Sequence, residues 1–248
     1  MMNTLFQRPL FFGTLAGLAL AAGLCVATLI GARTVLKIRE SNEINVTGSA
    51  RKDVRSDLVI WNASFTNTAK TLADAQAGAK ASLAEVLAFM KNAGLTDIAA
   101  APVEINKYHE KVKDPDGTER SIPAGYTITQ SIEVRSTDVD LVPGVAGSTA
   151  SLVDKGVILQ TARIRFIYTK AGEAKVEMMG EATKDARVRA EQIAAQGGGK
   201  IKALRHARMG VVQINPRYST ATSWEGNNDT TSLEKTITTT VTASFSLE

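Results

Sequence analysis

Alternating apolar and polar positions mark the first strands of the chain. Residues 57–68 carry apolar side chains at every second position: Val59, Trp61, Ala63 and Phe65. A period of two is typical of a strand that buries one face and leaves the other in solvent. Residues 43–54 form a second strand-like stretch just before it. We therefore predict that the two segments pair as a hairpin.

The same periodicity predicts further strands later in the chain. Residues 102–112 and 125–135 flank a polar stretch that contains Pro115-Asp116-Gly117, residue types that favour a turn, so these strands are predicted to pair. One face of the second strand of this pair holds Tyr126, Ile128, Ile132 and Val134, interrupted by Gln130. Three more segments are predicted as strands: residues 156–169, 200–214 and 234–247.

Three segments have the spacing of helices. Residues 71–93 repeat apolar side chains every three or four positions and begin with a capping box at Thr71 and Asp74. Residues 138–155 place Pro143 near a helix start and Gly156 at a natural stop. The longest helix is predicted over residues 174–196, and its stripe of mostly small apolar side chains would pack closely on a sheet: Met178, Ala182, Ala186, Ala190 and Ile193.

These elements predict an α+β fold in which antiparallel-rich sheets pack against amphipathic helices. We assign residues 43–248 to this body. Between its last two predicted strands lies a polar loop, residues 215–232, which carries Tyr218 and Trp224. Loops of this length are commonly functional or disordered.

The amino-terminal part of the chain is a separate region. Residues 10–31 are uncharged and have the length of a single transmembrane helix, between a short tail (residues 1–9) and a charged linker (residues 32–42). We interpret them as a signal anchor in a bacterial inner membrane, with the body in the periplasm. The alternative is secretion to the periplasm after cleavage at Ala19-Leu20-Ala21. Cys25, the single cysteine, lies in this segment and excludes an intramolecular disulfide.

The charges of the chain do not indicate a nucleic-acid partner. Its net charge is +4, but basic and acidic residues are interspersed. The carboxylates of Glu173, Glu177, Glu181 and Asp185 recur every four residues, and the basic residues around them indicate a solvated helix face. No Gly-x-Ser-x-Gly motif occurs. We therefore expect neither a catalytic site nor enzyme activity.

Two sequence features could indicate a cofactor site: a glycine-rich stretch and the histidines. Gly197, Gly198 and Gly199 precede Lys200, but a phosphate loop follows a strand and opens a helix, whereas here a helix precedes the glycines and a strand follows. We predict that they end the helix and that no nucleotide binds. The two histidines, His109 and His206, have no partner at metal-ligand spacing, so neither a metal nor another cofactor is expected.

Four segments resemble one known family, the SIMPL-domain proteins. They are INVTGSARKDVRSD, GYTITQSIEVRSTDVD, EAKVEMMGEATKDARVRAEQIAAQGGGKI and KTITTTVTASFSLE, and together they extend over most of residues 43–248. Family members commonly have Pro-Asp where this chain has Ser56-Asp57. The resemblance implies an α+β envelope protein of largely unknown function that can form homo-oligomers, in some cases linked to oxidative-stress defence. The family has no agreed active site to transfer.

The resemblance and the loop together lead to a functional hypothesis. We expect an anchored homo-oligomeric scaffold whose partners are other copies of itself and, through residues 10–31, the lipid bilayer. Tyr218 and Trp224 are the candidate oligomer contacts, because exposed aromatic side chains are enriched at interfaces. In the alternative, Trp224 folds back onto its own sheet. The alternative function is an envelope hydrolase or a small-ligand-binding domain.

Overall fold

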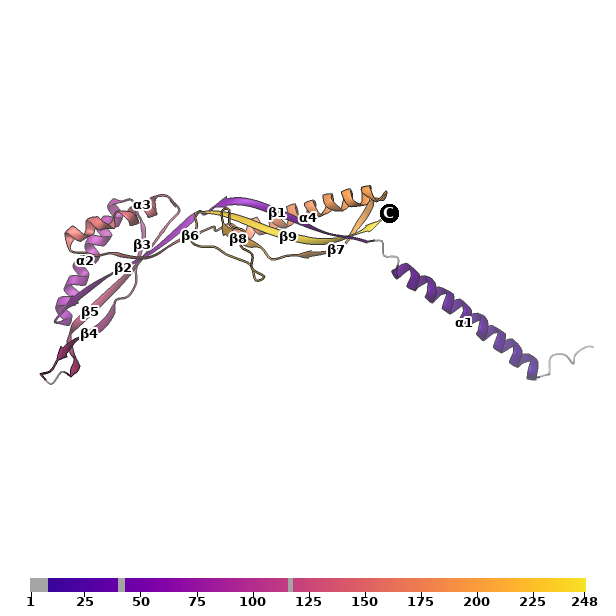
Figure 1. Ribbon diagram of the computed structural model, residues 1–248, viewed down its shortest axis with the longest axis horizontal. Helices are drawn as coiled ribbons and strands as arrows, with labels where there is room; N and C mark the ends of the chain where they lie inside the picture. Colours follow the sequence, from indigo (N-terminus) through magenta and orange to yellow (C-terminus); the bar gives the residue numbers. More distant parts are fainter. Residues whose placement is uncertain (1–8, 40–42, 116–117) are drawn as a thin grey trace, which may run out of the picture. The chain divides into compact units, whose positions relative to one another are not determined.

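A computed structural model describes residues 9–39, 43–115 and 118–248. The body is α+β with antiparallel sheets, as predicted (Figure 1). The elements in chain order are α1 (Pro9–Arg39), β1 (Glu43–Arg55), β2 (Leu58–Ala69), α2 (Leu72–Asn92), β3 (Asp97–Ala100), β4 (Glu104–Lys113), β5 (Glu119–Ser136), α3 (Leu141–Gly147), the 3-10 helix η1 (Thr149–Lys155), β6 (Gln160–Ile167), α4 (Ala171–Gln196), β7 (Ile201–Met209), β8 (Gln213–Pro216) and β9 (Glu234–Leu247).

Helix α1 contains the apolar amino-terminal segment. Its residues Gly13–Thr34 are long and apolar enough to cross a membrane, which fits a single-pass anchor or a signal sequence. The helix continues to Arg39, so most of the segment that we predicted as a linker is helical. Within the apolar part, Thr28 Oγ1 donates to the carbonyl oxygen of Leu24 (2.8 Å), which satisfies a hydroxyl that lipid could not.

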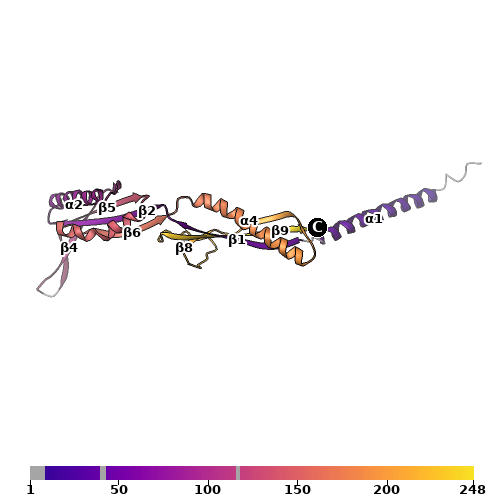
Figure 2. The same ribbon diagram turned by 90° about the horizontal axis from the view of Figure 1, so that it is seen from above.

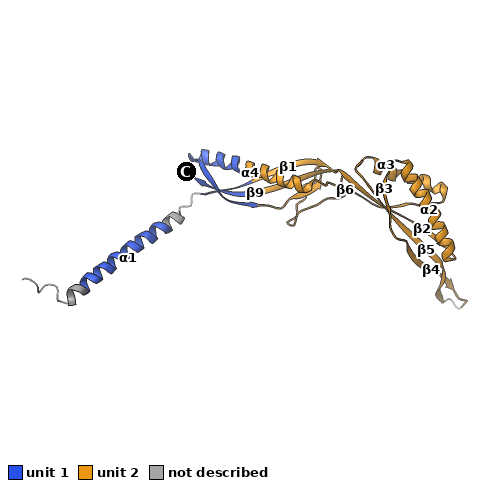
Figure 3. Cartoon of the chain, turned by 180° about the vertical axis from the view of Figure 1, so that it is seen from behind, with its two compact units in different colours: residues 1–47, 186–208, 242–248 blue, residues 48–185, 209–241 orange. Residues whose placement is uncertain are grey.

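The chain divides into two compact units (Figure 3). Unit 1 comprises residues 1–47, 186–208 and 242–248, and unit 2 comprises residues 48–185 and 209–241. The strands form two sheets. One has the order β1-β9-β7, with β8 also paired to β9, and the other has the order β3-β5-β2-β6, with β4 paired to β5.

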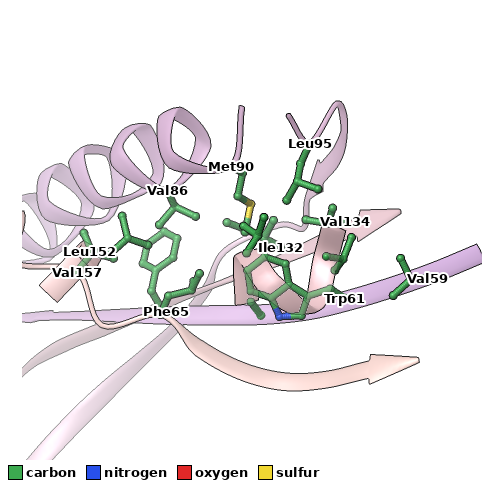
Figure 4. Packing of buried hydrophobic residues seen from close by; sticks show 14 of the residues in the cluster. Val59, Trp61, Phe65, Val86, Met90, Leu95, Ile132, Val134, Leu152 and Val157 are labelled. Carbon is green, nitrogen blue, oxygen red and sulfur yellow. The ribbon is translucent and has the colours of Figure 1, made fainter. Parts of the chain in front are cut away.

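The five-stranded sheet and its helices contain the largest core of unit 2. The apolar face of β2 is buried as its period predicted, and Trp61 and Phe65 lie at its centre (Figure 4). Helix α2 runs along β2 and β5 (Figure 2) and adds Val86 and Met90. Helices α3 and η1 contribute to the same cluster, so all three helices pack against one face of this sheet. Trp61 Nε1 donates to Thr161 Oγ1 at 3.3 Å.

The predicted β1–β2 hairpin is wrong, because the two strands belong to different sheets. Only Ser56 and Asp57 separate them, and both are held by other elements. The Ser56 amide donates to Leu233 O (2.9 Å) and the Asp57 amide to Ile167 O (3.0 Å). The Asp57 carboxylate also accepts bonds from the amide and the hydroxyl of Thr169. Burial raises the pKa of Asp57, but the Thr169 bonds outweigh it and lower that pKa.

The local signals of α2 and of the β4–β5 pair are confirmed. Thr71 is the N-cap of α2, its hydroxyl oxygen accepts from the Asp74 amide, and its hydroxyl donates to the Asp74 carboxylate (2.7 Å). Strands β4 and β5 pair antiparallel from Glu104 opposite Thr129 to Lys113 opposite Glu119. Asp116 and Gly117 of the predicted turn lie outside the described residues. Gln130, buried in the apolar face of β5, donates to the carbonyl oxygen of Ala101.

Three predicted boundaries need correction. Residues 138–155 form two short helices, because the chain leaves the α-helix at Ser148 and continues as η1. Gly156 ends η1 in the left-handed region (φ 78°), as expected for a helix stop. Residues 200–214 form two strands, β7 and β8, which are separated at Gly210, where the glycine amide donates to Thr240 O. Short strand β3 was not predicted.

The small-residue stripe of α4 is confirmed except at its last position. Six residues spaced by four are buried: Ala174, Met178, Ala182, Ala186, Ala190 and Ala194. Ile193 is exposed, because the buried row continues to Ala194 instead. In unit 2, Ala174 and Met178 pack with Ile214 and Ile237. In unit 1 the row packs with a second set of apolar side chains: Val46, Ala243 and Phe245.

The triple glycine ends α4, as predicted. Gly198 has a left-handed backbone (φ 77°), its amide donates to Ala195 O, and the Gly199 amide donates to Ala194 O. This pair of bonds is the Schellman motif, which satisfies the last carbonyls of a helix. The order of helix, glycines and strand is therefore opposite to that of a phosphate-binding loop.

Candidate functional site

Residues 217–233, between β8 and β9, form a structured loop that we call the aromatic loop. Tyr218 and Trp224, the two residues proposed as oligomer contacts, both lie in it and are 78% and 86% exposed. The alternative that Trp224 folds back onto its own sheet is therefore wrong. Tyr218 has a left-handed backbone (φ 68°), which is uncommon for a residue other than glycine.

Buried amide side chains of β8 hold the aromatic loop in place. Gln213 Nε2 donates to Ser223 O (2.6 Å), and Gln213 Oε1 accepts from the amides of Ser223 (3.2 Å) and Asn227 (2.9 Å). The amide oxygen and nitrogen of Gln213 are thus bonded to Ser223 and Asn227, which lie on either side of Trp224 in the loop. Three such bonds order a segment that has little apolar surface to bury.

A second amide repeats this arrangement two residues later on the same strand. Asn215 Nδ2 donates to Ala221 O (2.6 Å), and Asn215 Oδ1 accepts from Asn227 Nδ2 (2.9 Å). Two main-chain bonds also join β8 to the loop: the Ile214 amide donates to Asn227 O, and the Asp229 amide donates to Ile214 O. The loop is therefore attached to β8 through these bonds and one isolated parallel bridge at Ile214, and its long polar sequence is ordered.

The carboxyl end of the aromatic loop is fixed by a buried ion pair. Lys235 is 1% exposed, and its Nζ donates to Asp229 O (2.7 Å) and Asp229 Oδ2 (3.1 Å). The Asp229 carboxylate also accepts bonds from Thr231 and Ser232. Burial raises the pKa of Asp229, but the bonds from Thr231 and Lys235 outweigh it and lower the pKa to about 2.

The amino end of the loop lies within a chain of ion pairs. Arg217 Nε is 3.6 Å from Asp53 Oδ2, its Nη1 is 3.9 Å from Glu234 Oε2, and its guanidinium lies 5.2 Å from the ring centre of Tyr218. The Thr236 hydroxyl donates to Asp53 (2.6 Å), and this bond, with nearby arginines, lowers the pKa of Asp53. Arg217 thus connects Tyr218 to β1 and β9, although exposed pairs of this kind contribute little stability.

A hydroxyl-lined groove lies next to the loop in unit 2. Its volume is about 570 Å³, and its lining includes Arg51 of β1, Gln213 of β8 and Ser223 of the loop. Threonines of β9 supply further hydroxyl groups: Thr238, Thr239 and Thr240. Arg51 is the single titratable residue in the lining. The groove can therefore offer hydrogen bonds and one positive charge to a ligand.

The other candidate residues are separated by the fold. His109 lies on β4 and His206 on β7. Among residues 9–39, 43–115 and 118–248, no group of three or more His, Cys, Asp or Glu side chains could hold a metal ion. Two of the helix carboxylates have structural partners: Glu177 accepts from Lys52 Nζ (2.6 Å), and Asp185 accepts from the Ser49 amide (2.7 Å).

Comparison with models of protein families identifies one family that matches this chain. The model of the SIMPL family, described as a protein of unknown function (DUF541), matches residues 44–245. The chain belongs to the SIMPL family. This match extends from β1 to near the end of β9 and includes the groove, the aromatic loop and nearly all of both sheets. A comparison with curated proteins found no match.

Proposed function

We propose that this SIMPL-family chain is a single-pass membrane protein whose body assembles into a homo-oligomeric scaffold outside the cytoplasm. The observation that carries the proposal is the aromatic loop. It exposes Tyr218 and Trp224 to solvent while its backbone is hydrogen-bonded to the buried Gln213 of β8. A large exposed aromatic side chain on an ordered backbone loses little conformational entropy when a partner covers it. Such residues are the usual anchors of protein interfaces.

The sheets supply a second reason to expect assembly. Strand β7 pairs with β9 and lies at the end of its sheet, so its outer N–H and C=O groups have no strand beside them in the described part of the chain. Open edges of this kind favour pairing with another chain. A closed symmetric oligomer satisfies them and prevents open-ended growth. An anchor that confines the subunits to a plane would raise their effective concentration further.

The cellular setting is part of the same proposal. Residues 10–31 would anchor the chain in a bacterial inner membrane with the body in the periplasm, where the assembly would act as an envelope or oxidative-stress factor. A strain that lacks the protein is expected to be sensitive to envelope or oxidant stress. The full chain should restore growth, and a variant that cannot assemble should not.

Anchoring makes a prediction of its own. The protein is expected to stay in the membrane fraction after an alkaline wash, because the apolar part of α1 would bury about 20 residues in lipid. Its intact mass should include residues 10–31. A mature chain that begins near Ala22 would instead show that the segment is a cleaved signal sequence.

Replacing Trp224 with Ala is expected to weaken assembly about thirtyfold, since a hot-spot aromatic contributes about 2 kcal/mol or more to binding. Light scattering of the detergent-solubilised chain over a concentration series measures this change, and Tyr218→Ala should act in the same direction. Ile158→Ala is the matched control, because Ile158 is also an exposed apolar residue of unit 2 but lies outside the loop. A monomeric parent chain at micromolar concentration would refute assembly. An unchanged oligomer in both loop variants would refute the role of the loop.

Small-ligand binding is the second candidate function, and the groove beside the loop favours it. A volume of about 570 Å³ is in the range of ligand sites. The groove fits a binding domain better than a hydrolase, because its lining offers hydroxyls, an amide and Arg51 rather than a pair of titratable groups.

A further inference from the structure

Strand β7 is an exposed edge of the sheet, and all of its charged residues are basic. Residues 201–209 contain Lys202, Arg205, His206 and Arg208 and no acidic residue. Every residue of the strand after Ile201 is exposed. Neither Lys202 nor Arg208 has an ion-pair partner among the residues that the structure describes. The cluster is not a run of basic residues in the sequence, and it becomes apparent only when alternate residues are assigned to the two faces of the strand.

We call the even-numbered face of β7 the basic face: Lys202, Leu204, His206 and Arg208. Ile201 packs with the cluster that contains Ala186 and Ala190 of α4, so it lies on the helix side of the sheet, although the later odd-numbered residues are exposed as well. Alternation along a strand then places the even-numbered residues on the opposite side. Leu204, in the middle of the basic face, is 49% exposed.

The rest of this sheet face in unit 1 is polar. Thr47 Oγ1 and Thr242 Oγ1 lie 3.1 Å apart, and the Ser244 hydroxyl donates to Asn45 Oδ1. These side chains lie opposite Val46, Ala243 and Phe245, which pack against α4. Acidic residues in residues 43–47, 201–208 and 242–248 occur only at Glu43 and Glu248, at the ends of the segments. The face therefore combines positive charge with hydroxyl groups.

Chain connectivity limits how far the start of this face can lie from the bilayer if α1 crosses it. The apolar span ends at Thr34 and α1 ends at Arg39, a distance of about 8 Å along a helix. Strand β1 begins at Glu43, which can be at most about 14 Å further. Ile44 and Ile201 pack against the same cluster, so β7 starts at the same end of the sheet as β1, with β9 between the two strands.

We infer that the basic face binds the anionic headgroups of the membrane that anchors the chain. Positive charges attract an anionic surface, the hydroxyl and amide groups can bond to phosphate oxygens, and Leu204 can enter the boundary between headgroups and acyl chains. The inference rests on α1 as a membrane anchor and is independent of assembly, so an alkaline wash tests its premise separately. A second copy of the chain or an acidic protein on this face would leave the contact independent of lipid charge.

Proteoliposomes that contain the full chain provide the test. The probe is an environment-sensitive fluorophore on Leu204→Cys, combined with Cys25→Ser so that the label is specific, in vesicles of phosphatidylcholine with or without phosphatidylglycerol. We expect the fluorophore to be protected from acrylamide only when phosphatidylglycerol is present, and the protection to disappear in high salt. Hydrogen exchange of the β7 amides in the unlabelled chain should slow under the same conditions.

Removing the charges should release the face. Each basic residue near an anionic surface contributes roughly a factor of five to binding. Lys202→Gln with Arg208→Gln should therefore reduce the equilibrium constant for binding of the basic face to the membrane about 25-fold. Lys111→Gln with Lys113→Gln is the matched control, because these lysines are exposed on β4 in unit 2 and should leave protection unchanged. Equal quenching in both vesicle types, or protection that persists in the Lys202 and Arg208 variant, would overturn the inference.

Discussion

Replacing Asp229 with Asn is expected to lower the free energy of unfolding by about 3 kcal/mol, because the buried ammonium group of Lys235 loses its compensating charge. Lys235 is almost completely buried, and its Nζ lies 3.1 Å from Asp229 Oδ2. The variant keeps the bond from Lys235 to the main-chain oxygen of residue 229, which holds the loss at the lower end of the usual range. Chemical unfolding of the solubilised chain, followed by circular dichroism, measures the change.

A second substitution separates charge from packing. Asp229→Asn combined with Lys235→Met removes both charged groups and should recover most of the lost stability, since an apolar side chain of similar size can replace a buried ion pair at little cost. Lys52→Met is a surface control, because the ion pair of Lys52 with Glu177 is largely exposed and should contribute less than about 1 kcal/mol. A change of less than about 1 kcal/mol for Asp229→Asn alone would show that water reaches Lys235.

The same pair gives the stability of the chain a pH dependence at low pH. The pKa of Asp229 is about 2 in the folded chain, below its ordinary value of 3.8. The folded state therefore favours the ionised carboxylate, and this stabilisation is complete above about pH 4 and is lost as the pH falls towards 2. The difference corresponds to roughly 2 kcal/mol. Asp229→Asn lacks this group, so the stability gap between parent and variant should narrow over the same pH range.

The elements predicted correctly from sequence are those that local signals determine. The N-cap at Thr71, the glycines after Gln196 and the alternation of residues 234–247 each act over a few residues, and each produced the expected boundary. Which strands pair with one another is decided by contacts between residues far apart in the chain, and local signals do not report these contacts. Strands β1 and β2 were recognised as strands, but the bonds that direct them into different sheets come from Leu233 and Ile167, far away in the chain.

The candidate site was predictable from sequence only in part, for the same reason. Tyr218 and Trp224 were identifiable because large aromatics are unusual in a polar loop. Gln213 and Asn215 resemble ordinary polar strand residues in sequence, and only the fold shows that they are buried and bonded to the loop. The ion pair of Lys235 was missed because its partner, Asp229, lies in a loop whose conformation has no periodic signal. Hydrophobic periodicity does not report buried polar contacts.

Replacing Gly226 with Ala is expected to destabilise the chain by about 3 kcal/mol and to displace Trp224. Gly226 has a left-handed backbone (φ 93°), in which a residue with a Cβ is strained by about 1–2 kcal/mol. The added Cβ would also lie 2.7 Å from Val211 Cγ1 and 2.8 Å from Val212 O. A main-chain oxygen cannot rotate away as a flexible side chain can, so the loop must move off β8. Chemical unfolding and hydrogen exchange of residues 217–233 measure the two effects.

Gly180→Ala provides the contrasting control. Gly180 lies in the middle of α4, and an added Cβ there would meet no atom within 4 Å, so alanine should stabilise the helix by about 1 kcal/mol. Because Gly226 is two residues from Trp224 and beside the Asn227 bonds, its replacement should also weaken assembly in the light-scattering experiment, whereas Gly180→Ala should not. If Gly226→Ala unfolds like the parent and assembles equally well, the loop can adjust its backbone freely. Trp224 could then not be a preorganised anchor for a partner, because that role requires the loop to be ordered before binding.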